Sequence, residues 1–335
     1  MTDLSFSIQT VAECFDEALE FRNRNRPVAR DPEYYRWRYL ERPCAVPAYT
    51  VWVREGEQLL GAATVAPQDF CVNGKRSCLG LVGDISVAPD ARGKGVGSAL
   101  LRETRTALPE GVNDVLVLPN AEAEGPLRNA GWTMLSALQR RVKLIRPRAG
   151  AGLPAALAQR TVAMLGAAGQ AAVKALGPGA TIRLDLDPGD WLDELWAATP
   201  GKGFAAAVRD ARFVRWRFAL HPLERYRIAG IFRGDVPVGY LALHTEDRVC
   251  FIDDFLLLDG RLLWVLADAA ARAGGERSGL EAVQLRLNGG SLSRIAGLTG
   301  FMRRQDTQSI MLGGKLSAAG SPAQDWFFTA GDKDV

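Results

Sequence analysis

The amino-acid sequence predicts an α/β protein of the α+β type, built from two related domains. Three observations support this prediction. Residues 81–108, LVGDISVAPDARGKGVGSALLRETRTAL, have the pattern of a strand, a glycine-rich turn and a helix. Alternating apolar residues, which are typical of half-buried strands, occur in both halves of the chain. Finally, a segment of the first half recurs in the second half.

Length and composition indicate a globular protein. The chain has 335 residues, which is long for one domain and suitable for two. Hydrophobic residues make up 47% and charged residues 24%, so neither a disordered nor a membrane class is favoured. The formal charge of +3 argues against an extended nucleic-acid-binding face.

The cysteines and the N-terminus bear on the cellular compartment. The five cysteines include no C-x-x-C pair and there are only two histidines, so we expect free thiols in a reducing compartment and no metal site. The first ten residues, MTDLSFSIQT, lack the basic and apolar regions of a signal peptide. The segment Thr161–Val173 is too short to span a bilayer. We therefore expect a cytoplasmic protein with no membrane partner.

The elements of the first half follow from local patterns. A strand is expected at residues 4–8, where apolar and polar residues alternate, followed by a helix at 11–23. A hairpin is expected from 49–53 and 59–65. The strand that begins at Leu81 ends before Pro89, and apolar residues recur at helical spacing from Val96 to Leu108.

The repeat concerns a segment with a distinctive composition. RDPEYYRWRYLERP at 30–43 returns as RDARFVRWRFALHP at 209–222, displaced by 179 residues. The hairpin pattern that follows recurs at 226–243, and Val115–Asn120 is echoed by Val283–Asn288. A displacement of domain size with only two copies indicates an internal duplication rather than a solenoid.

The duplication suggests a division of the chain into three parts. Residues 1–147 form one predicted domain and residues 180–335 the other. The linker, residues 148–179, contains an alanine-rich helix from Leu153 to Leu176 that stops at Gly177-Pro178-Gly179. We expect this helix to pack on the domains, because a free linker would be more polar.

The glycines at 93, 95 and 97 suggest a phosphate site. Their amides are not shielded by side chains, and they precede a helix whose dipole is positive at that end. A Walker loop is excluded because no Lys-Ser/Thr pair follows, and a Rossmann fingerprint because the glycine spacing is wrong.

The strand with Val-x-Pro, the Arg-x-x-Gly-x-Gly loop and the helix together resemble the GNAT superfamily of acyl-CoA-dependent N-acyltransferases. The resemblance implies two tandem domains, each a mixed, mostly antiparallel sheet flanked by helices. It also implies that the loop amides hold the pyrophosphate of acetyl-CoA or another acyl-CoA while the preceding strand pairs with the pantetheine arm. The cofactor-binding residues so implied are Ile85, Val87, Arg92, Gly93, Lys94, Gly95, Val96, Gly97, Ser98 and Asn120. The second copy has only Leu258–Arg261 at the matching place, so we expect it to be degenerate and to bind no coenzyme A.

Two residues are candidate general bases. The resemblance places a catalytic carboxylate on or near the fourth strand, where Asp84 lies, and a turn or capping role is the alternative. His244 is the second candidate, since a histidine can titrate near neutrality, although a structural role is an alternative for it too. The tyrosine that serves as general acid in the family is absent, because position 127 is Leu. Another group must then protonate the leaving thiolate, and water is one candidate.

Trp37 and Trp216 lie among arginines in the repeated segment. One interpretation makes them core anchors with arginines along the rim. The other makes them a surface on which a base or sugar stacks while the arginines bind phosphate.

The leading functional hypothesis is an N-acyltransferase that moves an acetyl or short acyl group to a primary amine. The chain also resembles, more distantly, bacterial enzymes that acylate nucleotide-linked amino sugars, so such a sugar is the expected acceptor. The alternatives are an aminoacyl-tRNA-dependent peptidyl-type transferase and a non-catalytic acyl-CoA-binding module. The oligomeric state stays open, with a homodimer among the alternatives.

Overall fold

The computed structural model describes residues 4–199, 204–274, 279–288, 290–314 and 325–332. The first half contains the strands β1 (Leu4–Thr10), β2 (Tyr49–Glu55), β3 (Gln58–Val72), β4 (Lys75–Val87), β5 (Asp114–Val117) and β6 (Thr133–Leu144), with the helices α1 (Phe15–Asn25), α2 (Pro32–Tyr39), α3 (Val96–Thr106) and α4 (Ala121–Asn129). Helix α5 (Leu153–Leu176) follows. The second half contains β7 (Thr181–Arg183), β8 (Phe204–Ala207), β9 (Arg227–Arg233), β10 (Val236–Glu246), β11 (Val249–Leu257), β12 (Ala282–Leu287), β13 (Met302–Gly314) and β14 (Asp325–Trp326), with α6 (Asp190–Ala197), α7 (Ala211–Val214), α8 (Trp264–Gly274) and α9 (Ser291–Leu298).

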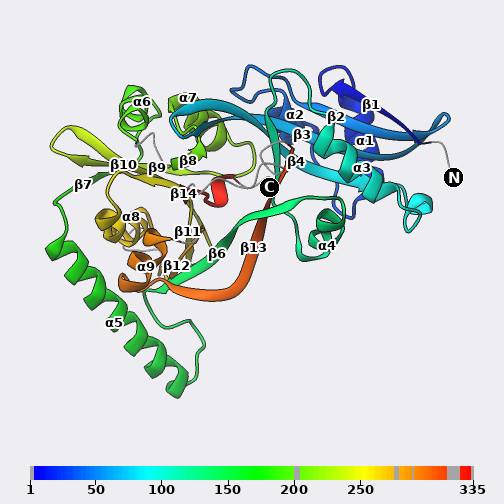
Figure 1. The fold of residues 1–335 in the computed structure, drawn as a ribbon. Helices are drawn as coiled ribbons and strands as arrows, with labels where there is room; N and C mark the ends of the chain where they lie inside the picture. Colours follow the sequence, from blue (N-terminus) through cyan, green and yellow to red (C-terminus); the bar gives the residue numbers. More distant parts are fainter. Residues whose placement is uncertain (1–3, 200–203, 275–278, 289, 315–324, 333–335) are drawn as a thin grey trace.

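The predicted mixed sheet with flanking helices is confirmed, but the two halves share one sheet instead of having one each (Figure 1). The strand order is β1-β2-β3-β4-β5-β13-β6-β12-β11-β10-β9-β7. Strand β13 of the second half pairs with β5 of the first half, and β6 of the first half pairs with β12 of the second. Each half therefore contributes its long strand to the other, and the exchange joins them.

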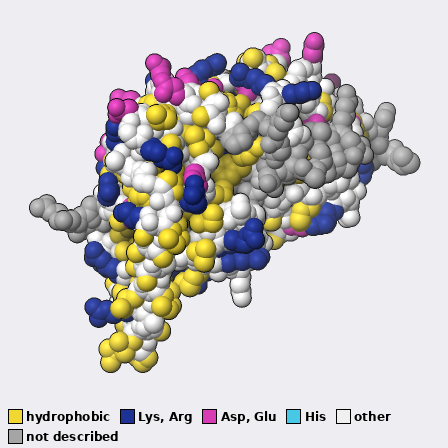
Figure 2. Space-filling model, turned by 60° about the vertical axis from the view of Figure 1, so that its left-hand side comes forward, with side chains coloured by type: hydrophobic (Ala, Val, Ile, Leu, Met, Phe, Trp, Pro, Cys, Tyr) yellow, Lys and Arg dark blue, Asp and Glu magenta, His cyan; other side chains and the backbone are white. Residues whose placement is uncertain are grey.

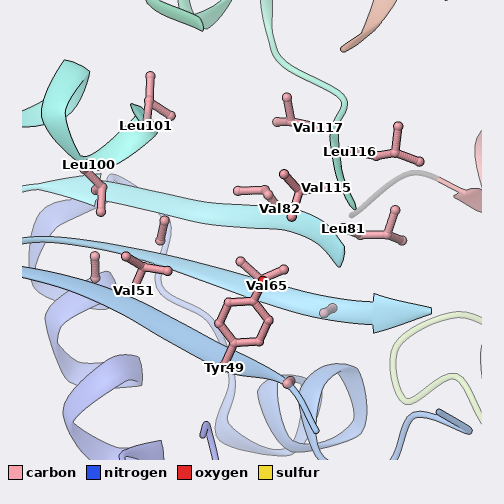
Figure 3. Packing of buried hydrophobic residues seen from close by; sticks show 14 of the residues in the cluster. Tyr49, Val51, Val65, Leu81, Val82, Leu100, Leu101, Val115, Leu116 and Val117 are labelled. Carbon is pink, nitrogen blue, oxygen red and sulfur yellow. The ribbon is translucent and has the colours of Figure 1, made fainter. Parts of the chain in front are cut away.

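The hydrophobic core follows the same exchange. In the first half, apolar side chains of β2 to β5 pack against Leu100 and Leu101 of α3, as Figure 3 shows. Ile310, Met311 and Leu312 of β13 are buried in that same cluster. Conversely, Tyr34 and Trp37 of the first half are buried in the cluster of the second half, so neither half closes its core alone.

The two tryptophans of the repeated segment meet at the junction of the halves. The rings of Trp37 and Trp216 stack with centroids 5.1 Å apart. Each Nε1 donates to the main-chain carbonyl of the other residue at 3.0 Å. Both side chains are buried, so they act as core anchors and offer no stacking surface for a ligand.

Helix α5 packs along the sheet by a face of small residues. Gly166 lies against Gly300 and Gly169 against Leu298, where a Cβ would meet backbone atoms. The larger residues Leu153, Met164 and Leu176 are exposed, and Figure 2 shows hydrophobic side chains along this projecting part of the molecule. The helix thus packs on the rest of the protein as expected, but not by the apolar stripe that runs along its sequence at helical spacing, because those residues are exposed: Leu153, Leu157, Met164, Ala168, Ala172 and Leu176.

Candidate active site

A cleft opens where β4 and β5 diverge. The two strands pair in parallel from Leu79 and Asp114 to Val82 and Val117, and the pairing stops there. Beyond this point β4 continues, whereas the chain after β5 turns through Pro119 into α4. The cleft has a volume of about 380 Å³ and is lined by residues 82–85, residues 117–120, side chains of α3 and α4, Gln308 of β13, and Arg26, Arg30 and Arg38.

A bulge in β4 aims Asp84 away from the regular strand direction. Ala62 pairs with Ser86 and Thr64 with Gly83, so two residues of β4 stand opposite one of β3. Asp84 has φ of 45° in this bulge, a conformation that non-glycine residues seldom adopt. The bulge leaves the backbone of β4 beside the cleft without a β5 partner.

The glycine loop, residues 92–95, has the geometry of an anion site. Gly93 and Gly95 have φ of 75° and 84°, and a Cβ at either would meet nothing within 4 Å. Helix α3 begins at Val96 with no side-chain cap, so its first-turn amides have no intrahelical acceptor. These unshielded amides at a positive helix end can bind a phosphate or pyrophosphate.

The loop arginine has a supporting role in this structure. Nε of Arg92 donates to the carbonyl of Val87 at 3.2 Å, and Nη2 donates to the carbonyl of Asn25 at 3.2 Å. These bonds tie the loop to β4 and to the end of α1. Arg92 therefore holds the loop in shape, which its position in the motif did not reveal.

The other predicted cofactor residues divide into two groups. Ile85 and Asn120 line the cleft. Val87, the last residue of β4, is half-buried, and Lys94 and Ser98 are at least partly accessible. The side chain of Val96 is buried, so only its amide can serve a ligand. Asn120 caps α4, its Oδ1 accepting from the amide of Ala123 at 2.9 Å.

Asp84 is enclosed by cationic and hydroxyl groups. Its Oδ1 accepts from Nε of Arg22 at 2.9 Å, its Oδ2 accepts from the hydroxyl of Tyr39 at 2.8 Å, and Nη1 of Arg38 lies 3.6 Å from Oδ2. Burial alone would raise the pKa of Asp84, but the charge of Arg38 and the bond from Arg22 outweigh it and lower the pKa to about 2. Such a carboxylate is a weak base, which argues against proton abstraction by Asp84 itself.

His244 is not brought to this cleft. Its Nδ1 lies 3.0 Å from Oδ2 of Asp253 in the second half, and its ring stacks on Phe251. Burial opposes the charged imidazole, but the bond to Asp253 prevails and raises the pKa of His244. Within the described chain, the cleft lining contains Asp84 and does not contain His244. The geometry therefore separates the two candidate bases.

Three lining residues had no role assigned from the sequence. Arg26 and Arg30 belong to the connection after α1, and although Arg30 begins the repeated segment, nothing in that segment indicated a place in a cleft. Gln308 comes from the exchanged strand β13, and its Nε2 donates to the carbonyl of Leu118 at 3.1 Å. Only the tertiary fold brings this residue of the second half to a cleft of the first.

The second half has a matching divergence of strands. β11 and β12 pair in parallel from Val249 and Ala282 to Ile252 and Leu285 and then part. Here the chain's own residues 326–329 lie beside the strand end: Leu287 bridges to Thr329, and Oδ1 of Asn288 accepts from the amide of Phe328 at 3.0 Å. The second opening therefore already has a protein segment at its edge.

Among the described residues, no three histidine, cysteine or acidic side chains come together in a group that could hold a metal ion. No helix in the described ranges has both the length and the apolar character needed to cross a membrane.

Comparison with known proteins places this geometry in a family context. Residues 5–134 match the model of the GNAT acetyltransferase domain. No curated protein shows a significant sequence match to the chain.

Similar solved structures cover nearly the whole chain. A protein of Enterococcus faecalis described as a probable N-acyltransferase matches with a TM-score of 0.65 and 12% identity, over 93% of this chain and 72% of that one. A GCN5-related N-acetyltransferase of Anabaena variabilis has a TM-score of 0.62 and 15% identity, over 92% and 72%. The N-myristoyltransferase of Saccharomyces cerevisiae with bound myristoyl-CoA has a TM-score of 0.53 and 13% identity, over 92% and 82%. At these identities the likeness establishes a GNAT-like fold.

Proposed function

We propose that this protein is a GNAT-type N-acyltransferase that moves an acetyl or other short acyl group from acyl-CoA to a primary amine. The observation that carries the proposal is the uncapped start of α3, preceded by two left-handed glycines, and it follows the strand β4 whose residues 82–85 line the cleft. The family match over residues 5–134 supports the same chemistry. One such site per chain is proposed, in the first half.

The residues fit an acyl-CoA molecule in a simple way. The amides that follow Gly95 bind the pyrophosphate, and no side chain of the glycines obstructs it. The unpaired edge of β4 beyond Val82 offers backbone groups to the amides of the pantetheine arm. The thioester supplies the acyl carbon: its bond to sulfur breaks as the bond to the amine nitrogen forms, and the sulfur leaves as the thiol.

We propose that arginines, rather than a strong base, prepare the amine. Arg26, Arg30 and Arg38 line the cleft, and cations nearby lower the pKa of an ammonium group, which increases the neutral, nucleophilic fraction. The proton then passes to water. Asp84 acts as a positioning residue because it fixes Arg22 and Arg38. With Leu at position 127, water also protonates the leaving sulfur.

We also propose that the chain arose by duplication, with copies at residues 1–147 and 180–335 and a linker at 148–179. The support is the matched bulges at Asp84 and at Asp253, and the reciprocal bonds of the two tryptophans. The strand exchange then means that a cut between the copies would leave β6 and β13 without their partners. The homodimer and the cytoplasmic location remain predictions from the sequence.

For the acceptor we propose an amino sugar, with a nucleotide-linked one as the specific hypothesis. The tryptophans give it no support, since they are buried against one another. Its support is the sequence resemblance and the cationic lining of the cleft, which suits a diphosphate. The two alternatives differ in their use of coenzyme A: a tRNA-dependent transferase needs none, and a silent acyl-CoA-binding module binds acyl-CoA without releasing the thiol.

The deciding experiment measures thiol release from acetyl-CoA with a panel of amines, together with mass-spectrometric detection of the N-acylated product. Turnover of any amine that depends on the enzyme supports the proposal. Binding of acetyl-CoA without thiol release across the panel would favour the silent module. Failure to bind acetyl-CoA would favour the tRNA-dependent alternative and remove the basis of the assignment.

A further inference from the structure

The side chain of Arg30 has a buried hydrogen-bond donor with no acceptor among the described residues. This donor is its Nε. Its guanidinium lies over the ring of Tyr34, 5.0 Å from the centroid. Buried polar groups are nearly always hydrogen-bonded, so one without a partner at the wall of a cleft points to a ligand group.

A hydrogen-bonded chain holds Arg30 in register with the bulge of β4. The amide of Arg30 donates to Oδ1 of Asn23 at 2.8 Å, and Nδ2 of Asn23 donates back to the carbonyl of Arg30 at 3.0 Å. Oδ1 of Asn23 also accepts from Nη1 of Arg22 at 2.9 Å, and Arg22 is bound to Asp84. The backbone of Arg30 is therefore linked through Asn23 and Arg22 to Asp84 in the bulge.

The charges around this end of the cleft do not balance. Arg26, Arg30 and Arg38 line it, and Asp84 is the acidic residue among the lining residues that the structure describes. Asp84 is already engaged by Arg22, Arg38 and Tyr39. Neither Arg26 nor Arg30 has a carboxylate within ion-pair distance in the described chain. The excess positive charge favours an anionic ligand.

We propose that Arg30, with Arg38 beside it, forms a subsite for an anionic group, a carboxylate or a phosphate, of the amine acceptor. The inference rests on the proposed N-acyltransferase function. It selects amines that carry a negative charge close to the amino group and disfavours polyamines and basic peptides, which the same arginines repel. The phosphates of acyl-CoA have a different proposed place, at the glycine loop, none of whose residues is among the described residues that line the cleft.

Arg26 is not assigned to this subsite. It follows Asn25, whose carbonyl accepts from Arg92 of the glycine loop, so Arg26 is next in the chain to a contact with that loop. Arg30 is linked to the bulge instead. We therefore expect substitutions of Arg26 and of Arg30 to have different kinetic effects, and the test below uses Arg30.

The test compares matched amines that differ in one anionic group: glucosamine 6-phosphate against glucosamine, O-phosphoethanolamine against ethanolamine, and glycine against glycinamide. The first two pairs report on phosphate and the third on carboxylate. We expect wild type to prefer an anionic member, and Arg30→Ala to lower kcat/KM for it by about 10–100-fold, the size of a lost charged hydrogen bond. The KM for acyl-CoA should not change. Arg30→Lys should recover part of the loss, because it keeps the charge without the guanidinium geometry.

Arg183→Ala is the control, since it removes an exposed arginine paired with exposed Asp235 in the second half. It should leave every ratio unchanged. Equal use of charged and neutral amines by wild type, or an Arg30→Ala effect confined to the KM of acyl-CoA, would overturn the subsite while the acyltransferase proposal stands.

A direct binding measurement separates the two proposals. If no amine is acylated, calorimetry with glucosamine 6-phosphate on the protein saturated with coenzyme A still tests the subsite. Binding by wild type but not by Arg30→Ala would support it although the acyltransferase proposal had failed. Absence of binding to either protein would refute the subsite as well.

Discussion

The two strand openings of this molecule begin alike and end differently. Each follows a short parallel ladder, between β4 and β5 in the first half and between β11 and β12 in the second. Each has a bulge in its leading strand. The first opening leads to an uncapped helix, whereas in the second Asp259 caps the following turn by accepting from the amide of Arg261. Among the described residues, the turn that follows the leading strand therefore ends at uncapped helix amides in the first opening and is side-chain-capped in the second.

The asparagines at the two strand ends show the same contrast. Asn120 caps α4 and lines an open cleft. Asn288 is buried and bonds to the backbone of Trp326 and Phe328, residues near the other end of the chain. The difference is that Asn120 bonds locally, within its own helix, whereas Asn288 fastens a distant segment of the chain to the end of its strand.

The buried network of the second opening predicts the largest effect. Arg209 is fully buried and bonds to Asp254 and to Asp332, so it ties β11 to the segment at residues 329–332. Arg209→Ala leaves two buried carboxylates without their cation, and we expect it to lower the free energy of unfolding by about 3–5 kcal/mol. Urea unfolding measures this. Arg183→Ala, which removes an exposed pair, should change it by less than about 1 kcal/mol; equal losses would show that the network is not structural.

A substitution in the glycine loop should weaken the binding of acyl-CoA, whereas a matched substitution in the second half should not. Gly95→Ala forces an alanine to φ of 84° and disturbs the amides that start α3, so we expect acyl-CoA affinity to fall by about 10–100-fold. Gly234→Ala is a matched control, because Gly234 has φ of 64° in a turn of the second half and equal free space. Calorimetry should give one site per chain and an unchanged affinity for this control. Two sites in wild type would contradict the comparison.

Asp84 predicts an acid dependence of stability. Its pKa of about 2 lies below the ordinary value of 3.8, so its contribution is present above the ordinary pKa and is lost as the pH falls through about 2. We expect the free energy of unfolding to fall by on the order of 2 kcal/mol between about pH 4 and pH 2, and this part to vanish in Asp84→Asn. Unfolding of wild type, Asp84→Asn and the exposed control Asp235→Asn over this range tests it.

The same variant tests the role of Asp84 in turnover. Asp84→Asn should lower kcat because Arg22 and Arg38 lose their partner, yet leave the shape of the pH–rate profile unchanged. If the variant instead removes a limb of that profile near neutrality, Asp84 is the general base and its pKa rises in the complex with substrates.

The comparison of the two asparagines includes the smallest expected effect, at Asn120. Asn120→Ala removes a helix cap, and we expect a loss of about 1 kcal/mol in the free energy of unfolding. Asn288→Ala removes buried bonds to the segment at residues 326–328 and should lower it more, by about 1–3 kcal/mol. Thermal unfolding of both variants gives the order. A larger loss at Asn120 would mean that the bonds of Asn288 do little to hold the segment at residues 326–328 to the end of β12.

Local sequence was sufficient for the loop and for the elements around it. Strand β4, the glycine loop and α3 depend on neighbouring residues: the apolar pattern, the break at Pro89 and glycines that tolerate positive φ. The second copy lacks those glycines, and its turn at residues 258–261 is capped by its own side chain. The absence of a tyrosine at position 127 is likewise a matter of sequence alone.

Tertiary structure decided how the site is completed. The exchange of β6 and β13, the burial of Asp84 among Arg22, Arg38 and Tyr39, and the arrival of Gln308 at the cleft all join residues far apart in the chain. Helix α5 shows most clearly what the sequence could not predict. The large apolar residues along it are exposed, and it packs through its glycines instead. Local patterns specify a helix or a loop, but the partners of a charge or of a strand edge depend on which surfaces fit together, and the folded chain alone determines that.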